Sequence, residues 1–249
     1  VGDLIDGPTE DVTALAAEWD SFDARAERAS APVFRVGGNH DLTGQVLRDV
    51  WADRYGPRYY HFVYKNVLFL VLDTEDHTDQ RMAQICDARA AALDAIARGE
   101  DATEMEYYQL PERMTGNVGT EQAEYFKTVL ADNADVRWTM LFMHKPVWRE
   151  GQDADFVEIE AALADRPYSV FNGHLHTMSH TIRNGRDYMM LGTTGGSQSV
   201  NTMSFDHVTL VTVGEGEPSI AHLRLDGILD KAGTIPGDDG NTCFQASQC

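Results

Sequence analysis

Lysine is scarce in this chain, where only Lys65, Lys127, Lys145 and Lys231 occur among 249 residues. The 20 Lys and Arg residues face 40 Asp and Glu residues, which gives a formal net charge of -20 at pH 7. Binding a nucleic-acid backbone over a broad surface requires clustered basic residues. The composition therefore argues against such binding, although bound divalent cations would still allow a small phosphorylated substrate.

Long apolar runs are also missing from the sequence. No run approaches the roughly 20 residues that a membrane-spanning helix needs, so we expect no membrane span. Cysteine is rare, and two of the three, Cys243 and Cys249, lie close together in a polar C-terminal stretch. Their spacing permits a small disulfide loop, which would imply an oxidising compartment. Two unpaired thiols are the alternative interpretation.

Strands and helices are predicted to alternate along most of the chain, whose length suffices for one sizeable core. The first residues, Val1 to Gly7, read as the end of a buried strand running into a loop. Periodicity predicts helices over 11–28, 46–55, 80–98, 120–131 and 155–164, and strands over 32–36, 59–64, 67–72, 138–143 and 168–171. This alternation favours an α/β layered core.

The pattern changes to hairpins after His176. Asn184-Gly185 is a two-residue turn signal, and strands are predicted over 180–183, 188–191, 207–213 and 219–225. Residues 99–119 are predicted to be irregular, either as a lid or pocket wall or as a plain surface excursion. We expect one domain over 1–230 and a polar tail over 231–249.

Potential metal ligands follow four of the predicted strands. They lie in Gly2-Asp3, Gly38-Asn39-His40-Asp41, His144 and Gly173-His174-Leu175-His176. In open α/β sheets, binding sites gather at the carboxyl ends of strands, so these segments can converge. Imidazole, carboxylate and amide oxygen suit Zn, Fe, Mn or a similar divalent ion. Each segment alone is weak evidence for a metal site, and a single Gly-Asp is usually just a turn. The four segments in this order are stronger evidence together.

This order of motifs resembles the calcineurin-like metallophosphoesterase superfamily, over a span from Asp3 to about Leu225. Residues 142–148 and 191–196 are further similar to its bacterial extracytoplasmic members. The resemblance implies an α/β fold, a four-layer αββα sandwich of two mixed β-sheets flanked by helices. Together with the two C-terminal cysteines, it favours a periplasmic or secreted protein, with a cytoplasmic location as the alternative.

The resemblance also implies roles for the residues of the motifs around two divalent metal ions. Asp3 would bridge the ions, Asn39, His144 and His174 would complete one set of ligands, and His176 would bind the other ion. His40 would act as general acid near the leaving-group oxygen, and Asp41 would hold its orientation. Such centres hydrolyse phosphate esters with a metal-bridging hydroxide.

One part of the family pattern is missing. The family normally supplies further ligands for the His176 metal from an Asp-x-His segment on its first strand, and none precedes Asp3. We expect that a native N-terminal segment, with its strand and helix, is absent from this chain. The alternatives are that a partner chain supplies these ligands, or that one firmly held metal suffices. Only the Asn39–His144–His174 set is complete.

The leading hypothesis is a metal-dependent hydrolase of small phosphate esters, either a phosphomonoesterase (phosphatase) or a phosphodiesterase. A catalytically impaired binding scaffold with the same fold is the alternative, supported by the missing N-terminal ligands. A metal-dependent hydrolase of another bond, such as an amide, would use similar ligands, but Gly38-Asn39-His40-Asp41 disfavours it.

Overall fold

The computed structural model describes residues 1–7, 9–149, 153–198 and 203–225. They divide into two compact units, Val1–His174 and a second unit that begins at Leu175. The predicted tail, with Cys243 and Cys249, lies outside the described residues. The domain boundary near residue 230 therefore stays a prediction.

The long helices of the first unit lie where periodicity predicts them. They are α1 (Val12–Ala26), α3 (Gln45–Tyr55), α4 (Asp79–Ala97), α6 (Thr120–Asp132) and α7 (Ala154–Ala162). Asp11 caps α1, since its carboxylate accepts the backbone N–H groups of Thr13 and Ala14 at 2.9 and 3.2 Å. Three short elements were not predicted: α2 (Asn39–Leu42), α5 (Glu106–Gln109) and the 3-10 turn η1 (Pro111–Arg113).

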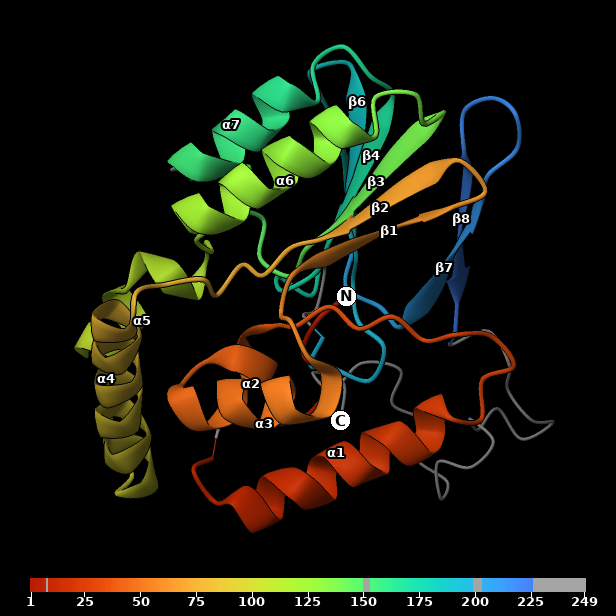
Figure 1. Cartoon of the computed structure of the whole chain (residues 1–249). Helices are drawn as coiled ribbons and strands as arrows, with labels where there is room; N and C mark the ends of the chain where they lie inside the picture. Colours follow the sequence, from red (N-terminus) through yellow and green to blue (C-terminus); the bar gives the residue numbers. More distant parts are fainter. Residues whose placement is uncertain (8, 150–152, 199–202, 226–249) are drawn as a thin grey trace, which may run out of the picture. The chain divides into compact units, whose positions relative to one another are not determined.

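A mixed sheet forms the centre of the first unit. Its strands β1 (Tyr60–Tyr64), β2 (Val67–Val71), β3 (Trp138–Phe142) and β4 (Tyr168–Asn172) follow one another in that order. β1 is antiparallel to β2, whereas β2, β3 and β4 are mutually parallel. Helices α6 and α7 lie side by side over one face of this sheet (Figure 1). Helices that cover a mixed, largely parallel sheet confirm the predicted α/β class.

Two predicted strand segments are wrong, because neither Val1 to Gly7 nor residues 32–36 form a strand. Side chains hold the second segment in place instead. The Tyr60 hydroxyl donates to the Arg35 carbonyl at 2.8 Å, and the Phe34 ring stacks on Phe62 at 4.2 Å. A strand needs a backbone partner, and the local pattern of apolar residues does not show whether one exists.

The second unit consists of antiparallel pairs, as predicted. Strands β5 (Ser179–Arg183) and β6 (Arg186–Met190) form a hairpin, and β7 (His207–Thr212) pairs with β8 (Ser219–Arg224). The turn residues Asn184 and Gly185 have φ values of 53° and 68°. Two successive positive φ angles suit the tight hairpin turn that Asn-Gly favours.

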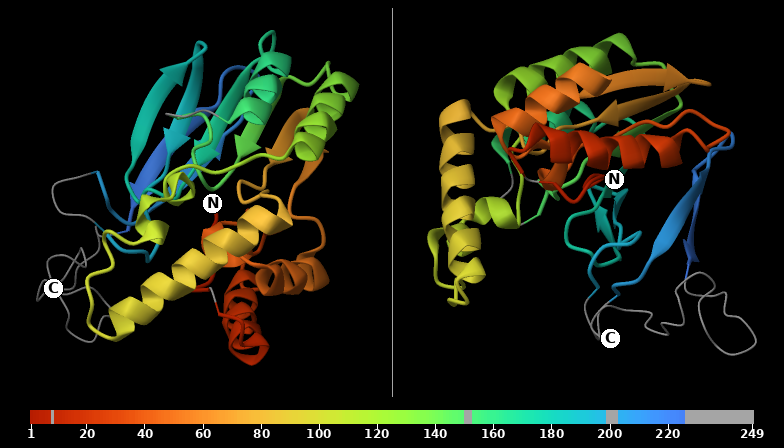
Figure 2. Two further views of the ribbon diagram at one scale, coloured as in Figure 1. Left: turned by 90° about the vertical axis from the view of Figure 1, so that its left-hand side faces the viewer. Right: turned by 90° about the horizontal axis from the view of Figure 1, so that it is seen from below.

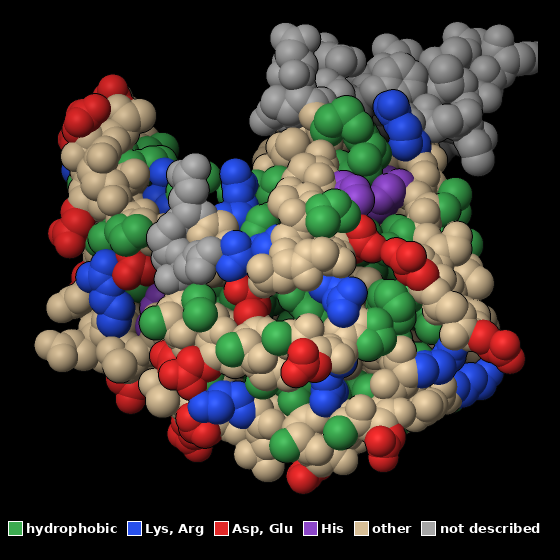
Figure 3. All heavy atoms as spheres, turned by 90° about the horizontal axis from the view of Figure 1, so that it is seen from above, with side chains coloured by type: hydrophobic (Ala, Val, Ile, Leu, Met, Phe, Trp, Pro, Cys, Tyr) green, Lys and Arg blue, Asp and Glu red, His purple; other side chains and the backbone are tan. Residues whose placement is uncertain are grey.

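Charged side chains are mixed by sign on the face shown in Figure 3, where acidic (red) and basic (blue) groups are interspersed. The net charge of -20 therefore does not appear on this face as a single acidic patch. None of the helices within the described ranges is both long and apolar enough to cross a bilayer.

An aromatic cluster joins α1 to α3, which pack together, while α4 lies beside α3 (Figure 2). Trp19 is fully buried, and its ring meets those of Trp51 and Tyr55 edge-on at centroid distances of 5.7 and 5.2 Å. Ile5 and Leu42 belong to the same buried cluster. Each follows shortly after a predicted site residue, so this core anchors both segments that carry the site.

Replacing Trp19 with alanine should lower the free energy of unfolding by about 3–5 kcal/mol, because it leaves a large cavity in this cluster. Urea denaturation of both proteins measures the change. Val12→Ala is the control, since Val12 lies on the same helix and is 58% exposed. Its effect should stay within about 0.5 kcal/mol, and equal losses in the two variants would contradict the assigned core.

Candidate metal centre

His144 lies just past the end of β3 and is the centre of the candidate site. Its side chain is only 3% exposed. The Nδ1 atom lies 2.8 Å from the Val1 carbonyl oxygen, to which it can only donate. The Nε2 atom lies 3.0 Å from Asp3 Oδ2 and 3.1 Å from Asn39 Oδ1. Three atoms of the kinds that bind metals therefore converge on one point.

The chemistry of these atoms fits a cation. In the form that binds a metal ion, with hydrogen on Nδ1 alone, the His144 ring would direct the Nε2 lone pair at a carboxylate and an amide oxygen, neither of which has a hydrogen to give. A divalent ion satisfies all three, whereas the chain alone needs a proton on Nε2. Asp3, His144 and His174 also offer ligand atoms that all lie within 4.8 Å of one another. This donor set suits Zn, Fe or Mn.

His174 follows β4 through Gly173 and completes the group. Its ring centroid lies 5.1 Å from that of His144, at an interplanar angle of 73°. The Nε2 atom lies 2.6 Å from the Arg113 carbonyl oxygen, which leaves Nδ1 as the nitrogen with a free lone pair. Burial, aided by the charges of His144 and Lys145, lowers the pKa of His174 to about 3. The ring is therefore neutral near pH 7, as a metal ligand must be.

Asp3 and His174 share an unusual backbone conformation. Their φ angles are 53° and 73°, in the left-handed region that costs a residue with a side chain about 1–3 kcal/mol. Asp3 Oδ1 accepts the backbone N–H of His40 at 2.9 Å. Burial alone would raise the pKa of Asp3, but the attraction of His144 and the contacts with His40 hold it well below its usual range. Asp3 is thus an ionised carboxylate, ready to bind a cation.

Asp41 ties the two loops of the site together. Its carboxylate is fully buried and accepts the N–H groups of Leu4 and Gly38 at 2.9 and 2.8 Å, and that of Ile5 at 3.3 Å. Burial, together with the nearby charge of Asp3, raises the pKa of Asp41 to about 6. These bonds go to the backbone beside Asp3 and Asn39, and the predicted role of Asp41 in orienting His40 stays a prediction.

His40 lies at the edge of the group, and its Nδ1 atom contacts the Asp6 carbonyl oxygen. That contact leaves Nε2 as the nitrogen available to a substrate. His40 is not one of the three side chains that could share a metal ion. Its predicted role as general acid, rather than ligand, stays a prediction that this arrangement suits.

His176 belongs to the second unit. Its Nδ1 atom lies 2.7 Å from the Ser197 carbonyl and 3.0 Å from the Ser197 hydroxyl. Within the described ranges, one group of three or more His, Cys, Asp or Glu side chains could hold a metal ion, and His176 is not in it. Its role as a ligand of a second metal ion therefore stays a prediction.

Gly38→Ala should weaken metal binding by about 10–100-fold, the size of effect that changes behind the ligands produce. A Cβ atom on Gly38 would lie 2.3 Å from Asp3 Oδ1 and 2.5 Å from the Asp3 backbone nitrogen, so Asp3 must move. Chelator competition with Zn²⁺ measures the affinity. Gly216→Ala is the control, because nothing lies within 4 Å of its Cβ position. Unchanged affinity in Gly38→Ala would show that Asp3 is not held as described.

A comparison with protein families identifies the chain. The profile described as calcineurin-like phosphoesterase matches residues 1–178, which include every predicted site residue. The chain belongs to this family. A comparison with curated proteins found no match. Calcineurin-like phosphoesterases typically bind divalent metals and hydrolyse phosphoesters, and the site geometry above agrees with that general chemistry.

Sequence reasoning missed the backbone groups that contact the candidate site histidines of this calcineurin-like phosphoesterase. The carbonyl oxygens of Val1, Asp6 and Arg113 contact the rings of His144, His40 and His174. A backbone carbonyl leaves no mark on the sequence. Lys145 could have been noticed, because a lysine is rare in this chain and this one directly follows a predicted ligand.

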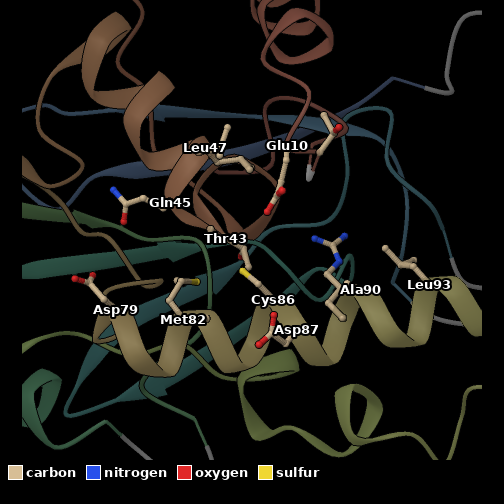
Figure 4. A pocket seen from close by; sticks show the side chains of 15 residues that line it. Glu10, Thr43, Gln45, Leu47, Asp79, Met82, Cys86, Asp87, Ala90 and Leu93 are labelled. Carbon is tan, nitrogen blue, oxygen red and sulfur yellow. The ribbon is translucent and has the colours of Figure 1, made fainter.

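A separate cavity of about 480 Å³ lies between α4 and the start of α3. In Figure 4, the Cys86 sulfur and the side chains of Thr43 and Glu10 face this space. Burial raises the pKa of the Cys86 thiol. None of the predicted metal ligands lines the cavity, so it is distinct from the candidate metal centre.

Proposed function

We propose that this chain is a metal-dependent hydrolase that cleaves phosphate esters of small molecules. The observation that carries the proposal is the convergence of Asp3 Oδ2 and Asn39 Oδ1 on His144 Nε2, at 3.0 and 3.1 Å, in a calcineurin-like phosphoesterase. His174 supplies a further neutral nitrogen to the same group. The net charge of -20 favours small substrates over long polyanions.

A divalent metal bound at this site would lower the pKa of a coordinated water and offset the charge of the phosphoryl oxygens. The residues of the chain do the rest. Asp3, Asn39, His144 and His174 hold the cation, and the Asp41 carboxylate keeps the Asp3 and Asn39 segments in register. His40 donates a proton from Nε2 to the leaving alkoxide, while the Asp6 carbonyl holds the ring by Nδ1.

Metal reconstitution with paired model substrates tests the proposal. The metal-stripped protein is loaded with Zn²⁺, Mn²⁺ or Fe²⁺ and assayed with p-nitrophenyl phosphate and bis-p-nitrophenyl phosphate. We expect turnover that requires metal and that is lost in Asn39→Leu. The ratio of the two rates decides between a phosphomonoesterase and a phosphodiesterase.

The same assay separates the alternative functions. Tight metal binding without turnover of either ester would favour the binding scaffold. Turnover of an amide substrate, but of neither phosphate ester, would favour a hydrolase of another bond. Absence of metal binding in the wild-type chain would overturn the proposal, because no other group of described residues has the ligands.

A further inference from the structure

Lys145 is one of the most deeply placed charges in the first unit. Its side chain is 5% exposed, and its ammonium lies 2.6 Å from the Glu75 carboxylate, which is 1% exposed. A buried ion pair of this kind costs much of its attraction in lost hydration, so it is weak evidence for stability. The role of Lys145 is therefore inferred from the other contact of its ammonium group.

The second contact of Lys145 is with the loop that reaches His174. Nζ donates to the Glu112 carbonyl oxygen at 2.6 Å. The next carbonyl along the chain, that of Arg113, is the one that accepts from His174 Nε2 at 2.6 Å. Two consecutive carbonyls of η1 therefore link the two residues: Lys145 binds the Glu112 carbonyl, and His174 binds the Arg113 carbonyl.

Further contacts fix this loop against the body of the first unit. The Arg81 guanidinium pairs with the Glu112 carboxylate at 2.7 Å. Beyond η1, the Asn117 backbone N–H donates to the Thr74 carbonyl at 2.9 Å, and the Thr74 hydroxyl accepts the Lys145 N–H at 3.0 Å. Contacts of Glu112 and Asn117 thus hold the chain in place on both sides of Arg113.

We propose that Lys145 is a positioning residue of the metal centre. Its ammonium holds the Glu112–Arg113 peptide groups so that the Arg113 carbonyl keeps hydrogen on His174 Nε2 and leaves Nδ1 as the metal-binding nitrogen. Lys145 directly follows His144 in the chain. In this proposal, His144 binds the metal ion itself, and Lys145 positions the second histidine ligand, His174. The inference rests on the proposed metal site but not on which ester is cleaved.

The tautomer of His174 can be read directly, without metal or substrate. In the ¹⁵N spectrum of imidazole-labelled, metal-free wild-type protein, we expect the Nε2–H form of His174 alone. Lys145→Met should produce a mixture with the Nδ1–H form and weaken Zn²⁺ binding by about 10–100-fold. Lys145→Arg, which can still donate to the Glu112 carbonyl, should restore most of both properties.

Two further variants complete the experiment, one to guard against a loss of folding and one as a control. Lys145→Met combined with Glu75→Gln removes the buried charge that Lys145→Met alone would leave unpaired. Lys127→Met is the matched control, since Lys127 also pairs with carboxylates at 2.7 Å but is 33% exposed, and its partners Glu124 and Glu158 are not predicted site residues. It should leave tautomer and Zn²⁺ affinity unchanged.

An Nδ1–H tautomer in the wild type would overturn the inference at once. So would a wild-type tautomer and an affinity within twofold of wild type in the folded double variant. A chain that hydrolyses no phosphate ester, yet shows the expected spectra and Zn²⁺ affinities, would refute the proposed function and leave the role of Lys145 standing.

Discussion

Alanine at His144 or at His174 will empty the candidate site of metal. Each change removes a nitrogen ligand from the Asp3–His144–His174 group. The loss of Zn²⁺ affinity should therefore exceed the roughly 10–100-fold that changes outside the ligand set cause. Phosphoester turnover should fall to background in both variants at ordinary metal concentrations. Chelator competition and elemental analysis of the purified proteins measure the first effect, and the reconstitution assay measures the second.

His180→Ala is the control for these two variants. His180 also lies near a carboxylate, with its Nε2 atom 2.6 Å from Asp187 Oδ1, but its side chain is 56% exposed. Metal content and turnover should match the wild type. A His174→Ala protein that is folded and still binds one equivalent of Zn²⁺ as tightly as the wild type would remove His174 from the ligand set.

Alanine at His40 will have a different signature, with metal retained and turnover slowed by about 10²–10⁴-fold. His40 is outside the ligand group, and its Nδ1 is held by the Asp6 carbonyl. A general acid matters most when the leaving group is basic. The loss should therefore be large for an alkyl phosphate ester and small for a p-nitrophenyl ester.

This dependence on the leaving group decides the role of His40. Equal losses with both esters, at unchanged metal content, would contradict proton donation. Loss of metal in His40→Ala would instead make His40 part of the metal site. Gly216→Ala is again the control, because nothing lies within 4 Å of its Cβ position. It should leave the rates with both esters unchanged.

Most helices and strands of the structure could be predicted from the sequence, because each depends on a local pattern. The apolar run Val67–Val71 became the buried strand β2, and Asp11 became the cap of α1. Residues 32–36 show where this reasoning fails. Their apolar side chains resemble a strand, but strand formation depends on a backbone neighbour that no local pattern reveals.

The candidate site divides in the same way. The order of Gly-Asp, Gly-Asn-His-Asp, His and Gly-His-x-His predicted which residues would supply ligands, and the family match covers all of these segments. The positive φ angles of Asp3 and His174 could not be foreseen, since Asp and His adopt them more often than most residues but still only in a small minority of cases. The surrounding contacts impose them, and they set where each ligand points.

The sequence by itself determined the family, the α/β class and the chemical types of the candidate metal ligands, because these depend on residue types and their order. Only the tertiary structure decided which ring nitrogen of His144 and His174 lies against a backbone carbonyl, which carboxylate lies beside His144, and that Asp41 joins two backbone loops. Those outcomes depend on carbonyl and N–H groups from Val1, Leu4, Gly38 and Arg113. Every residue has such groups, so only folding determines which of them meet a given side chain.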